Sequence, residues 1–423
     1  MNSIKVAICA EGFIGWGGGR DFIATIAEGL ETSENVDTIL LIMRYSFLDK
    51  LLGRIKDFIK CKGNWSFYRK LNDKRTANEK LIKVSEPLLI EIFRTCSPNT
   101  KIVKYTHSTN RLINTRTKKM KKCIKKNGID VILPQIEVGI EDLGIPVIGY
   151  LYDFQHKYLL DFFSQEEIAI RDGNFKRQID NSKYLIVNAE DVKKDIYKFF
   201  PEYKGKVIVL PFKPFQTLAL KDQVDLDKYE LPEKYYVICN QFWVHKSHRL
   251  AFAALEKIFN DGYTDIHIVC TGKMEDERFP QYIQELKKYL FGLNCKNNIH
   301  FVGFVPKKDQ LQIMNRAIAL VQPTLFEGGP GGGAVYNALC LGMPCIVSDI
   351  RVNREITGYQ NVYFFKANNV DDLAKKMLEH IHDKHQDKEE VERKIVQNKK
   401  EYADELLGQL LEIIEDYKNH DRV

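Results

Sequence analysis

Short apolar runs alternate with segments of helical spacing along most of the chain, and this alternation constrains the fold more than any other feature. Strand-like runs occur at residues 4–10, 38–43, 131–134, 147–152, 184–187, 235–239, 266–270, 299–302, 319–323, 345–347 and 362–364. Such short, continuously apolar runs indicate strands that are buried on both faces. Strands separated by helices over this length predict an α/β protein with parallel sheets.

The length of 423 residues predicts two domains. We place a first α/β domain at residues 1–213, a linker at 214–232, a second α/β domain at 233–390 and a C-terminal amphipathic helix at 391–423. The linker is rich in proline and charge and has little apolar periodicity. We expect the C-terminal helix to cover apolar surface, because one of its sides carries Leu406, Leu410, Ile413, Ile414 and Tyr417.

Composition restricts where such a protein works. Hydrophobic residues make up 44% and charged residues 28% of the chain, as in globular proteins. No window approaches 18 consecutive apolar residues, and the run at 4–10 is too short for a signal peptide. The nine cysteines form no CxxC pair, which favours buried thiols in a reducing compartment. We therefore expect a cytoplasmic protein.

The strongest local signal is a glycine-rich loop between the apolar run at 319–323 and a helical segment at 334–341. Glu327 directly precedes this loop, which contains Gly328, Gly329, Gly331, Gly332 and Gly333. Glycines let the backbone approach a ligand closely, and a helix start presents unpaired N–H groups. The combination favours phosphate binding, with Glu327 in the crevice at the carboxyl ends of the strands. A glycine-rich turn that only permits tight packing is the alternative.

A second glycine loop follows the first apolar run and contains Gly15, Gly17, Gly18 and Gly19. It does not match the GxGxxG pattern, which disfavours a nicotinamide cofactor. Two such loops, one per domain, suggest one phosphate-bearing ligand in a central cleft between two Rossmann-like domains. Lys246 follows the first strand of the second domain, where its charge suits a diphosphate. His245 and His248 have HxxH spacing, but no Asp, Glu or Cys completes a metal-binding set, so we interpret them as polar cleft residues.

These motifs together resemble those of the retaining glycosyltransferases of family 4, which have the GT-B fold. The segment FEGGPGGGAVYNALCLGMPCIVSDIRVNREI is similar to that family's acidic, glycine-rich donor-binding segment. The preceding stretch, from residue 299, resembles the region in which a loop, here with Gly303, flanks the base of the donor. Residues 240–246 lie where the family has an Arg-x4-Lys phosphate clamp, and Gly18 and Gly19 lie at its first glycine loop. Residues 152–156 match a family pattern near the transferred sugar.

Two departures from the family pattern concern the donor site. Family members usually carry two glutamates eight positions apart, whereas here Asn337 stands ten positions after Glu327. Gln241 takes the place of the clamp arginine, which leaves Lys246 as the only cation of the clamp. We therefore expect a nucleotide site with altered contacts, in which Asn337 hydrogen-bonds a ribose hydroxyl.

The resemblance implies transfer of a sugar, with retention of its anomeric configuration, from a nucleoside-diphosphate sugar to a hydroxyl of a glycan or lipid-linked glycan, as in bacterial surface polysaccharide synthesis. Backbone N–H groups of both glycine loops and Lys246 would stabilise the leaving diphosphate. Glu327 would hold sugar hydroxyls, and His156 or Asp153 would position the sugar or the acceptor hydroxyl. A structural histidine and a helix-capping aspartate are the alternatives. Amides and a lysine supply the positive field, so we expect no metal and no other cofactor.

A basic insertion at about 44–126 carries 23 Lys/Arg and 6 Asp/Glu, in a chain with a net charge of +6. Residues 45–62 predict an amphipathic helix, which Trp65, Phe67 and Tyr68 follow. This pattern fits an anionic membrane surface, as expected for a lipid-linked acceptor and a protein peripheral on the cytoplasmic face of the membrane. An ordinary helix packed on its domain is the alternative. No recognised nucleic-acid module appears, so we expect no nucleic acid partner.

Three other functional interpretations stay open. A metal-dependent GT-A transferase would need a DxD motif, but residues 225–227 offer those letters only within the charged linker. A sugar-nucleotide epimerase or a phosphorylase on the same fold would keep the phosphate loops. A non-catalytic scaffold would fit the departures at Asn337 and Gln241.

Overall fold

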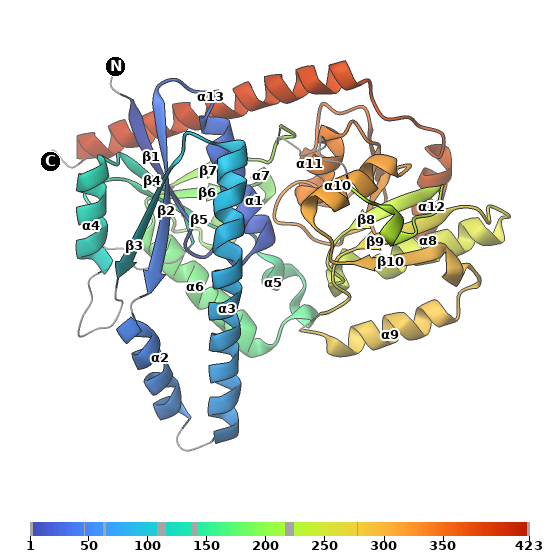
Figure 1. Cartoon of the computed structure of the whole chain (residues 1–423), viewed down its shortest axis with the longest axis horizontal. Helices are drawn as coiled ribbons and strands as arrows, with labels where there is room; N and C mark the ends of the chain where they lie inside the picture. Colours follow the sequence, from blue (N-terminus) through green and yellow to red (C-terminus); the bar gives the residue numbers. More distant parts are fainter. Residues whose placement is uncertain are drawn as a thin grey trace.

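The computed structural model describes residues 3–45, 47–61, 65–107, 116–136, 142–215, 224–276 and 278–420. Two α/β domains lie side by side, and a long C-terminal helix extends from the second domain across the first (Figure 1). Residues 216–223, in the expected linker, lie outside the described residues. None of the described helices is both long and apolar enough to cross a membrane.

The first domain is built on a seven-stranded sheet in the order β3-β2-β1-β4-β5-β6-β7, with parallel pairing between neighbours. Its strands are β1 (Ile4–Cys9), β2 (Val36–Tyr45), β3 (Lys101–His107), β4 (Val131–Gln135), β5 (Val147–Tyr150), β6 (Tyr184–Val187) and β7 (Lys206–Val209). The sequence patterns miss two of these strands. β3, at one edge of the sheet, has lysines among its apolar residues. β7, at the other edge, has only four residues.

The second domain has a six-stranded parallel sheet in the order β10-β9-β8-β11-β12-β13. Its strands are β8 (Tyr235–Cys239), β9 (His267–Thr271), β10 (Ile299–Gly303), β11 (Leu320–Gln322), β12 (Cys345–Ser348) and β13 (Val362–Phe365). In both sheets the strand order reverses beside the domain's first strand, as in doubly wound dinucleotide-binding folds. The prediction of two Rossmann-like domains is therefore confirmed.

Helices cover the sheets and bury the apolar faces of the strands. The first domain contains α1 (Gly17–Leu30), α4 (Arg116–Asn127), α5 (Gln155–Tyr158), α6 (Gln165–Asn181) and α7 (Glu190–Phe199). The second contains α8 (His248–Asn260), α9 (Pro280–Phe291), α10 (Lys307–Arg316), α11 (Gly332–Cys340) and α12 (Val370–Glu379). Short 3-10 turns join several elements, among them Val244–Lys246 after β8 and Arg351–Glu355 after β12.

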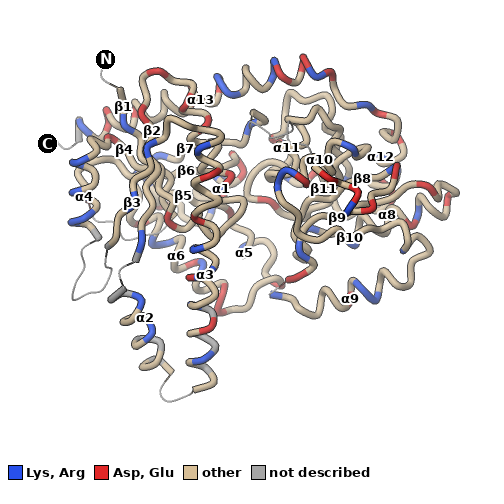
Figure 2. The backbone as a smooth tube through the Cα atoms, viewed as in Figure 1, with Lys and Arg blue, Asp and Glu red and all other residues tan. Residues whose placement is uncertain are grey.

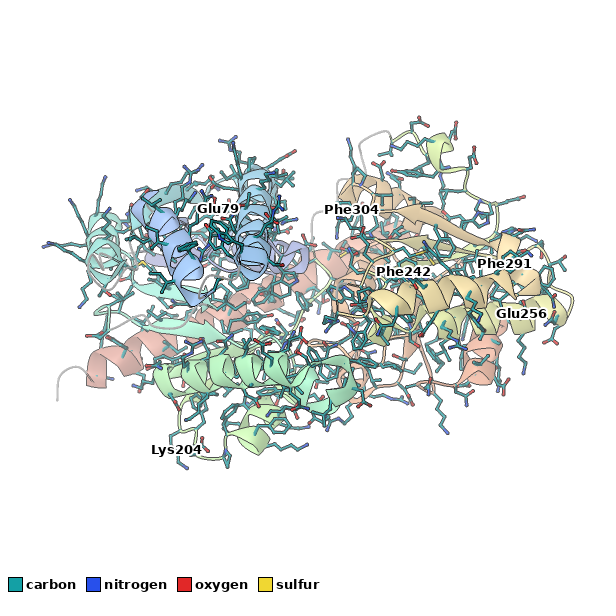
Figure 3. All side chains as sticks on the ribbon, turned by 90° about the horizontal axis from the view of Figure 1, so that it is seen from below. Glu79, Lys204, Phe242, Glu256, Phe291 and Phe304 are labelled. Carbon is teal, nitrogen blue, oxygen red and sulfur yellow. The ribbon has the colours of Figure 1, made fainter. Side chains whose placement is uncertain are left out.

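The basic insertion contributes a two-helix arm, made of α2 (Phe47–Lys60) and the outer part of α3 (Trp65–Cys96). The arm projects from the first domain, and lysines and arginines lie along it (Figures 1 and 2). Leu89 and Phe93, near the end of α3, are buried in the domain core. Seen from below, Glu79 lies between the two helices, where its carboxylate is 3.4 Å from the guanidinium of Arg54 (Figure 3).

The C-terminal helix α13 (Lys388–His420) belongs to the packing of both domains. Near its start, Val391 contacts Gly342 of the second domain. Further along, Leu406, Leu410 and Ile413 are fully buried in the core of the first domain. The prediction that this helix covers apolar surface is therefore confirmed.

A half-buried carboxylate links the two domains beside α7. Glu355 of the second domain accepts hydrogen bonds from the N–H groups of Glu190 and Asp191, at 2.8 and 2.7 Å. These N–H groups begin α7 and have no partner within the helix, so the carboxylate caps it from the other domain. Burial raises the pKa of Glu355. The same boundary holds a cavity of about 430 Å³, whose lining includes Lys193, Phe212, Lys213, Tyr336, Glu355 and Tyr359.

Candidate active site

The glycine loop of the second domain connects β11 to α11, as the sequence predicts. Gly331 and Gly332 have φ values of 67° and 64°, a left-handed conformation that favours glycine. The N–H of Gly331 donates to Asn353 Oδ1 at 2.8 Å, and that of Gly332 to the carbonyl of Gly329 at 3.3 Å. These two amides, which the sequence analysis assigned to phosphate, therefore hold the loop together. Gly333 is exposed, and a Cβ placed there would have nothing within 4 Å.

Lys246 and Glu327 form an ion pair with 2.5 Å between Nζ and Oε1. The lysine follows β8 and the glutamate follows β11, so two neighbouring parallel strands deliver the pair to one edge of the sheet. Their side chains are only 12% and 9% exposed. Gln322 Nε2 donates to the same carboxylate oxygen at 3.0 Å, and Asn240 Nδ2 donates to Gln322 Oε1 at 2.6 Å. Neither Gln322 nor Asn240 belongs to a motif with an expected role, although each lies at or directly after the end of its strand.

The loop after β5 places Asp153 of the first domain against this pair. A Cβ at Gly328 would lie 2.3 Å from the carbonyl oxygen of Tyr152 and 3.0 Å from Cβ of Asp153, so only glycine allows the two loops to approach so closely. Asp153 accepts from the N–H of Gln155 at 3.0 Å, which is the helix-capping bond considered as its alternative role. Burial raises the pKa of Asp153, and the nearby Glu327 carboxylate raises it further.

His156 lies deeper in the first domain. Its side chain has no exposed surface, and Nε2 is 2.9 Å from Asp172 Oδ1 of α6. The rings of Phe154, Phe163 and Phe175 surround the imidazole. Burial lowers the pKa of His156. The structure therefore places this side chain against α6, and it does not bring it to Glu327 as it does Asp153.

The remaining candidates come from both domains. Gly18 and Gly19 lie in the first turn of α1. Gly18 is exposed, whereas Gly19 is buried beneath Trp16: a Cβ at Gly19 would be 2.3 Å from the indole. Gln241 accepts from the N–H of Lys273 at 3.0 Å.

Two further candidates lie in the second domain. Gly303 ends β10 with a φ of 74°, and a Cβ there would have nothing within 4 Å. Asn337 is buried within α11.

The histidines of the HxxH segment are core residues. His248 stacks on Phe242 with 3.9 Å between ring centres, and neither of its ring nitrogens has a hydrogen-bond partner among the described residues. Burial lowers the pKa of His245 to about 2 and that of His248 to about 3. Both are therefore neutral at physiological pH. The expectation of polar residues lining the cleft does not describe His248, which is fully buried.

Comparison with known proteins agrees with this architecture. Residues 224–402 match the family model described as glycosyl transferases group 1. No curated protein matches the chain in a sequence comparison. Among solved structures, HepE of Anabaena in complex with UDP and glucose is 13% identical, with 99% of each chain covered and a TM-score of 0.54.

Two further solved structures have the same overall arrangement. A glycosyltransferase from Rickettsia africae is 13% identical with a TM-score of 0.58, and sucrose-phosphate synthase from Thermosynechococcus elongatus is 12% identical with a TM-score of 0.57. In both comparisons 99% of each chain is covered. The chain therefore has the two-domain GT-B fold of these glycosyltransferases, and its second domain, with the Lys246–Glu327 pair, lies within the segment that matches the group 1 family model.

Proposed function

We propose that this protein is a retaining glycosyltransferase, which moves a sugar from a nucleoside-diphosphate sugar to a hydroxyl of a glycan or lipid-linked glycan. The observation that carries the proposal is the buried Lys246–Glu327 pair beside the glycine loop, with Asp153 of the other domain packed against Gly328. The match to the group 1 family model and the UDP and glucose bound to HepE support the same conclusion. A role in surface polysaccharide synthesis accords with such an acceptor.

Lys246 has the central role in this proposal. In the structure its ammonium group neutralises Glu327. A bound diphosphate offers the lysine a second anionic partner, and the charge that develops on the leaving diphosphate strengthens that contact in the transition state. Glu327 is then free to accept hydrogen bonds from hydroxyls of the transferred sugar, while Gln322 keeps the carboxylate oriented. Because Lys246 supplies a positive charge and backbone N–H groups donate hydrogen bonds, the scheme requires no metal.

Asp153 supplies the contribution of the first domain. Its half-buried carboxylate lies at the boundary between the domains, where we assign it the positioning of the acceptor hydroxyl or of the transferred sugar. His156 supports it indirectly, because its bond to Asp172 ties α5 to α6. Gly303 and Asn337 are the proposed contacts of the base and the ribose, and Gly18 and Gly333 those of the diphosphate.

A ligand panel and one substitution test this function. UDP, GDP, ADP and CMP, each with its sugar conjugates, are compared for their effect on the thermal unfolding midpoint, and NMR of the product reports the anomeric configuration. Glu327→Ala should abolish transfer and leave nucleotide affinity within a few-fold, because the carboxylate contacts the sugar. Glu379→Ala, which removes an exposed ion pair on α12, is the control. Unchanged turnover in the Glu327 variant would remove this residue from the mechanism.

We also propose that the α2–α3 arm attaches the protein to an anionic membrane surface on the cytoplasmic side. Several large apolar side chains of the arm are exposed, by 44% to 68%, among them Leu51, Ile55, Phe58, Ile59 and Trp65. Phe58, Trp65 and Tyr68 cluster at the end of α2 and the start of α3, with ring centres 5.4 to 5.8 Å apart. Aromatic and apolar groups flanked by lysines suit the interface of an anionic bilayer.

Co-sedimentation with vesicles of phosphatidylglycerol and phosphatidylcholine tests this attachment. Binding should weaken as salt rises, because screening acts on the lysines. Ile59→Ser and Trp65→Ser should release the protein. Val396→Ser is the control, since Val396 is 70% exposed on α13, outside the arm. Absence from the pellet at low salt would refute the attachment.

A further inference from the structure

Two arginines from opposite domains meet at one aromatic ring beside the candidate active site. The guanidinium carbon of Arg171, on α6, lies 4.6 Å from the ring centre of Phe163. The guanidinium carbon of Arg278, in the segment between β9 and α9, lies 5.1 Å from the same ring centre. Tyr152 and Trp243 contribute further rings, at 5.8 Å from Arg171 and 5.6 Å from Arg278. A guanidinium that stacks on a ring keeps the N–H groups at its edge available for in-plane hydrogen bonds.

The ionic contacts of this arginine pair are long. Arg171 Nη1 is 3.8 Å from Asp153 Oδ1, and Arg278 Nε is 3.9 Å from Asp276 Oδ1, whereas a charge-assisted bond is about 2.7–2.9 Å long. Arg278 also donates to Gln155 Oε1 at 3.3 Å. Arg171 Nη1 is buried and has no hydrogen-bond partner among the described residues.

Neighbouring carboxylates are engaged elsewhere. Asp153 accepts a hydrogen bond from the N–H of Gln155. Asp276 accepts hydrogen bonds from the backbone N–H groups of Val244, Arg278 and Phe279. Glu167 accepts from Ser164, in the capping box of α6. Both guanidinium groups lie within 5.1 Å of the Phe163 ring centre, and like charges so placed repel each other. Burial together with the charge of Arg171 lowers the pKa of Arg278. An added oxyanion would offset this repulsion and take up the N–H groups.

We propose that Arg171 and Arg278 bind one carboxylate or phosphate group of a sugar substrate between the two domains. The proposal rests on the glycosyltransferase function only in that the anion is carried by a substrate of that reaction. Trp243, which is 38% exposed, and the neighbouring rings offer apolar faces to the sugar that carries the anion. The anion belongs either to an acidic acceptor or to the donor diphosphate. In the second case the two arginines take over the role of the clamp arginine, whose place Gln241 occupies in this chain.

Calorimetry on the full chain distinguishes these two sources. The probes are UDP, for the donor, and three glycosides with the same ring, for the acceptor: methyl glucoside, methyl glucuronide and methyl glucoside 6-phosphate. Arg171→Gln and Arg278→Gln should each weaken binding of at least one anionic probe by about tenfold or more, and leave methyl glucoside unaffected. A loss confined to UDP identifies the donor diphosphate, and a loss confined to an acidic glycoside identifies the acceptor.

Two further variants control the experiment. Arg278→Lys keeps the charge but not the fork of N–H groups, so its loss should be smaller than that of Arg278→Gln. Arg249→Gln should leave all affinities unchanged, because Arg249 stacks in the same way on Tyr289, 4.4 Å from the ring centre, on another part of the second domain.

Wild-type affinities for all anionic probes in folded Arg171→Gln and Arg278→Gln would overturn the proposal, as would a wild-type protein that binds none of them. If Arg278→Gln does not fold, the affinities of Arg278→Lys for the anionic probes are used instead, and wild-type values there would overturn the proposal. The glycoside measurements contain no nucleotide, so they are independent of the proposed function, which fails if the wild-type protein transfers no sugar from any donor.

Discussion

The Lys246–Glu327 pair makes a quantitative prediction about stability. Both side chains are at least 88% buried, so removing one partner leaves the other charge without compensation in a medium of low polarity. A variant in which both residues are replaced by uncharged ones leaves no unpaired buried charge and therefore avoids this cost. Lys246→Met and Glu327→Gln should each lower the free energy of unfolding by about 3 kcal/mol, at the lower end of the range for buried pairs. In Lys246→Met, Gln322 still donates a hydrogen bond to the Glu327 carboxylate. The double variant should lose only about 1 to 2 kcal/mol.

A double-mutant cycle measures this coupling. Urea unfolding of the four proteins at pH 7 should give a coupling free energy of about 4 to 5 kcal/mol for the pair, which is the sum of the two single losses less the loss in the double variant. The matched control is the ion pair between Lys257 and Asp371, which has the same 2.5 Å separation but side chains that are 47% and 78% exposed. Lys257→Met and Asp371→Asn should show a coupling of about 0.5 kcal/mol or less. If the two cycles gave equal couplings, the reasoning from burial would be refuted.

Three further predictions concern acid stability, domain contact and the C-terminal helix. His248 is neutral when folded, with a pKa of about 3, and takes up a proton on unfolding below pH 6.5, so it destabilises the protein as pH falls. His248→Phe should therefore reduce the pH dependence of the unfolding free energy between pH 6 and 4 by about 1.4 kcal/mol per pH unit, as measured by urea titrations. Equal slopes of the unfolding free energy against pH in the wild type and the variant would contradict this. Gly328→Ala should lower the turnover number, measured in a transfer assay, by about tenfold or more, because the added methyl group would meet the Tyr152 carbonyl and force the domains apart. Gly173→Ala is the control and should leave turnover unchanged, because its methyl group would have nothing within 4 Å. Leu410→Ala should cost about 2–5 kcal/mol in urea unfolding, whereas Leu411→Ala, at a position that is 48% exposed, should cost far less.

Strand and helix periodicity predicted the architecture because buried parallel strands leave a local signal. β6 and β8 begin and end where their apolar runs do, and the glycine loop lies at the junction of β11 and α11 as expected. The two edge strands of the first domain, β3 and β7, were missed; β3 is an example of a partly exposed strand, which does not need a continuous apolar run. Within the basic insertion an amphipathic helix was predicted at residues 45–62, but the 32-residue helix α3, which continues through Pro87, was missed.

The site was predicted less completely, because its contacts join residues that are far apart in the sequence. A strand-end position was enough to select Lys246 and Glu327, but not to show that they pair with each other. His156 follows a strand in the same way, yet its ring turns to Asp172 on a later helix. Arg171 and Arg278 belong to no motif, and only the packing of one domain on the other brings them to the same ring.

The course of α13 has a consequence for synthesis on the ribosome. The second domain is continuous in the chain from β8 to α12, so its sheet can assemble once those residues have emerged. The first domain is translated earlier but lacks Leu406, Leu410 and Ile413 until the end, and these side chains fill its interior. Nascent chains should therefore carry an incomplete first domain with an exposed apolar groove, open to chaperones, while the second domain is already native.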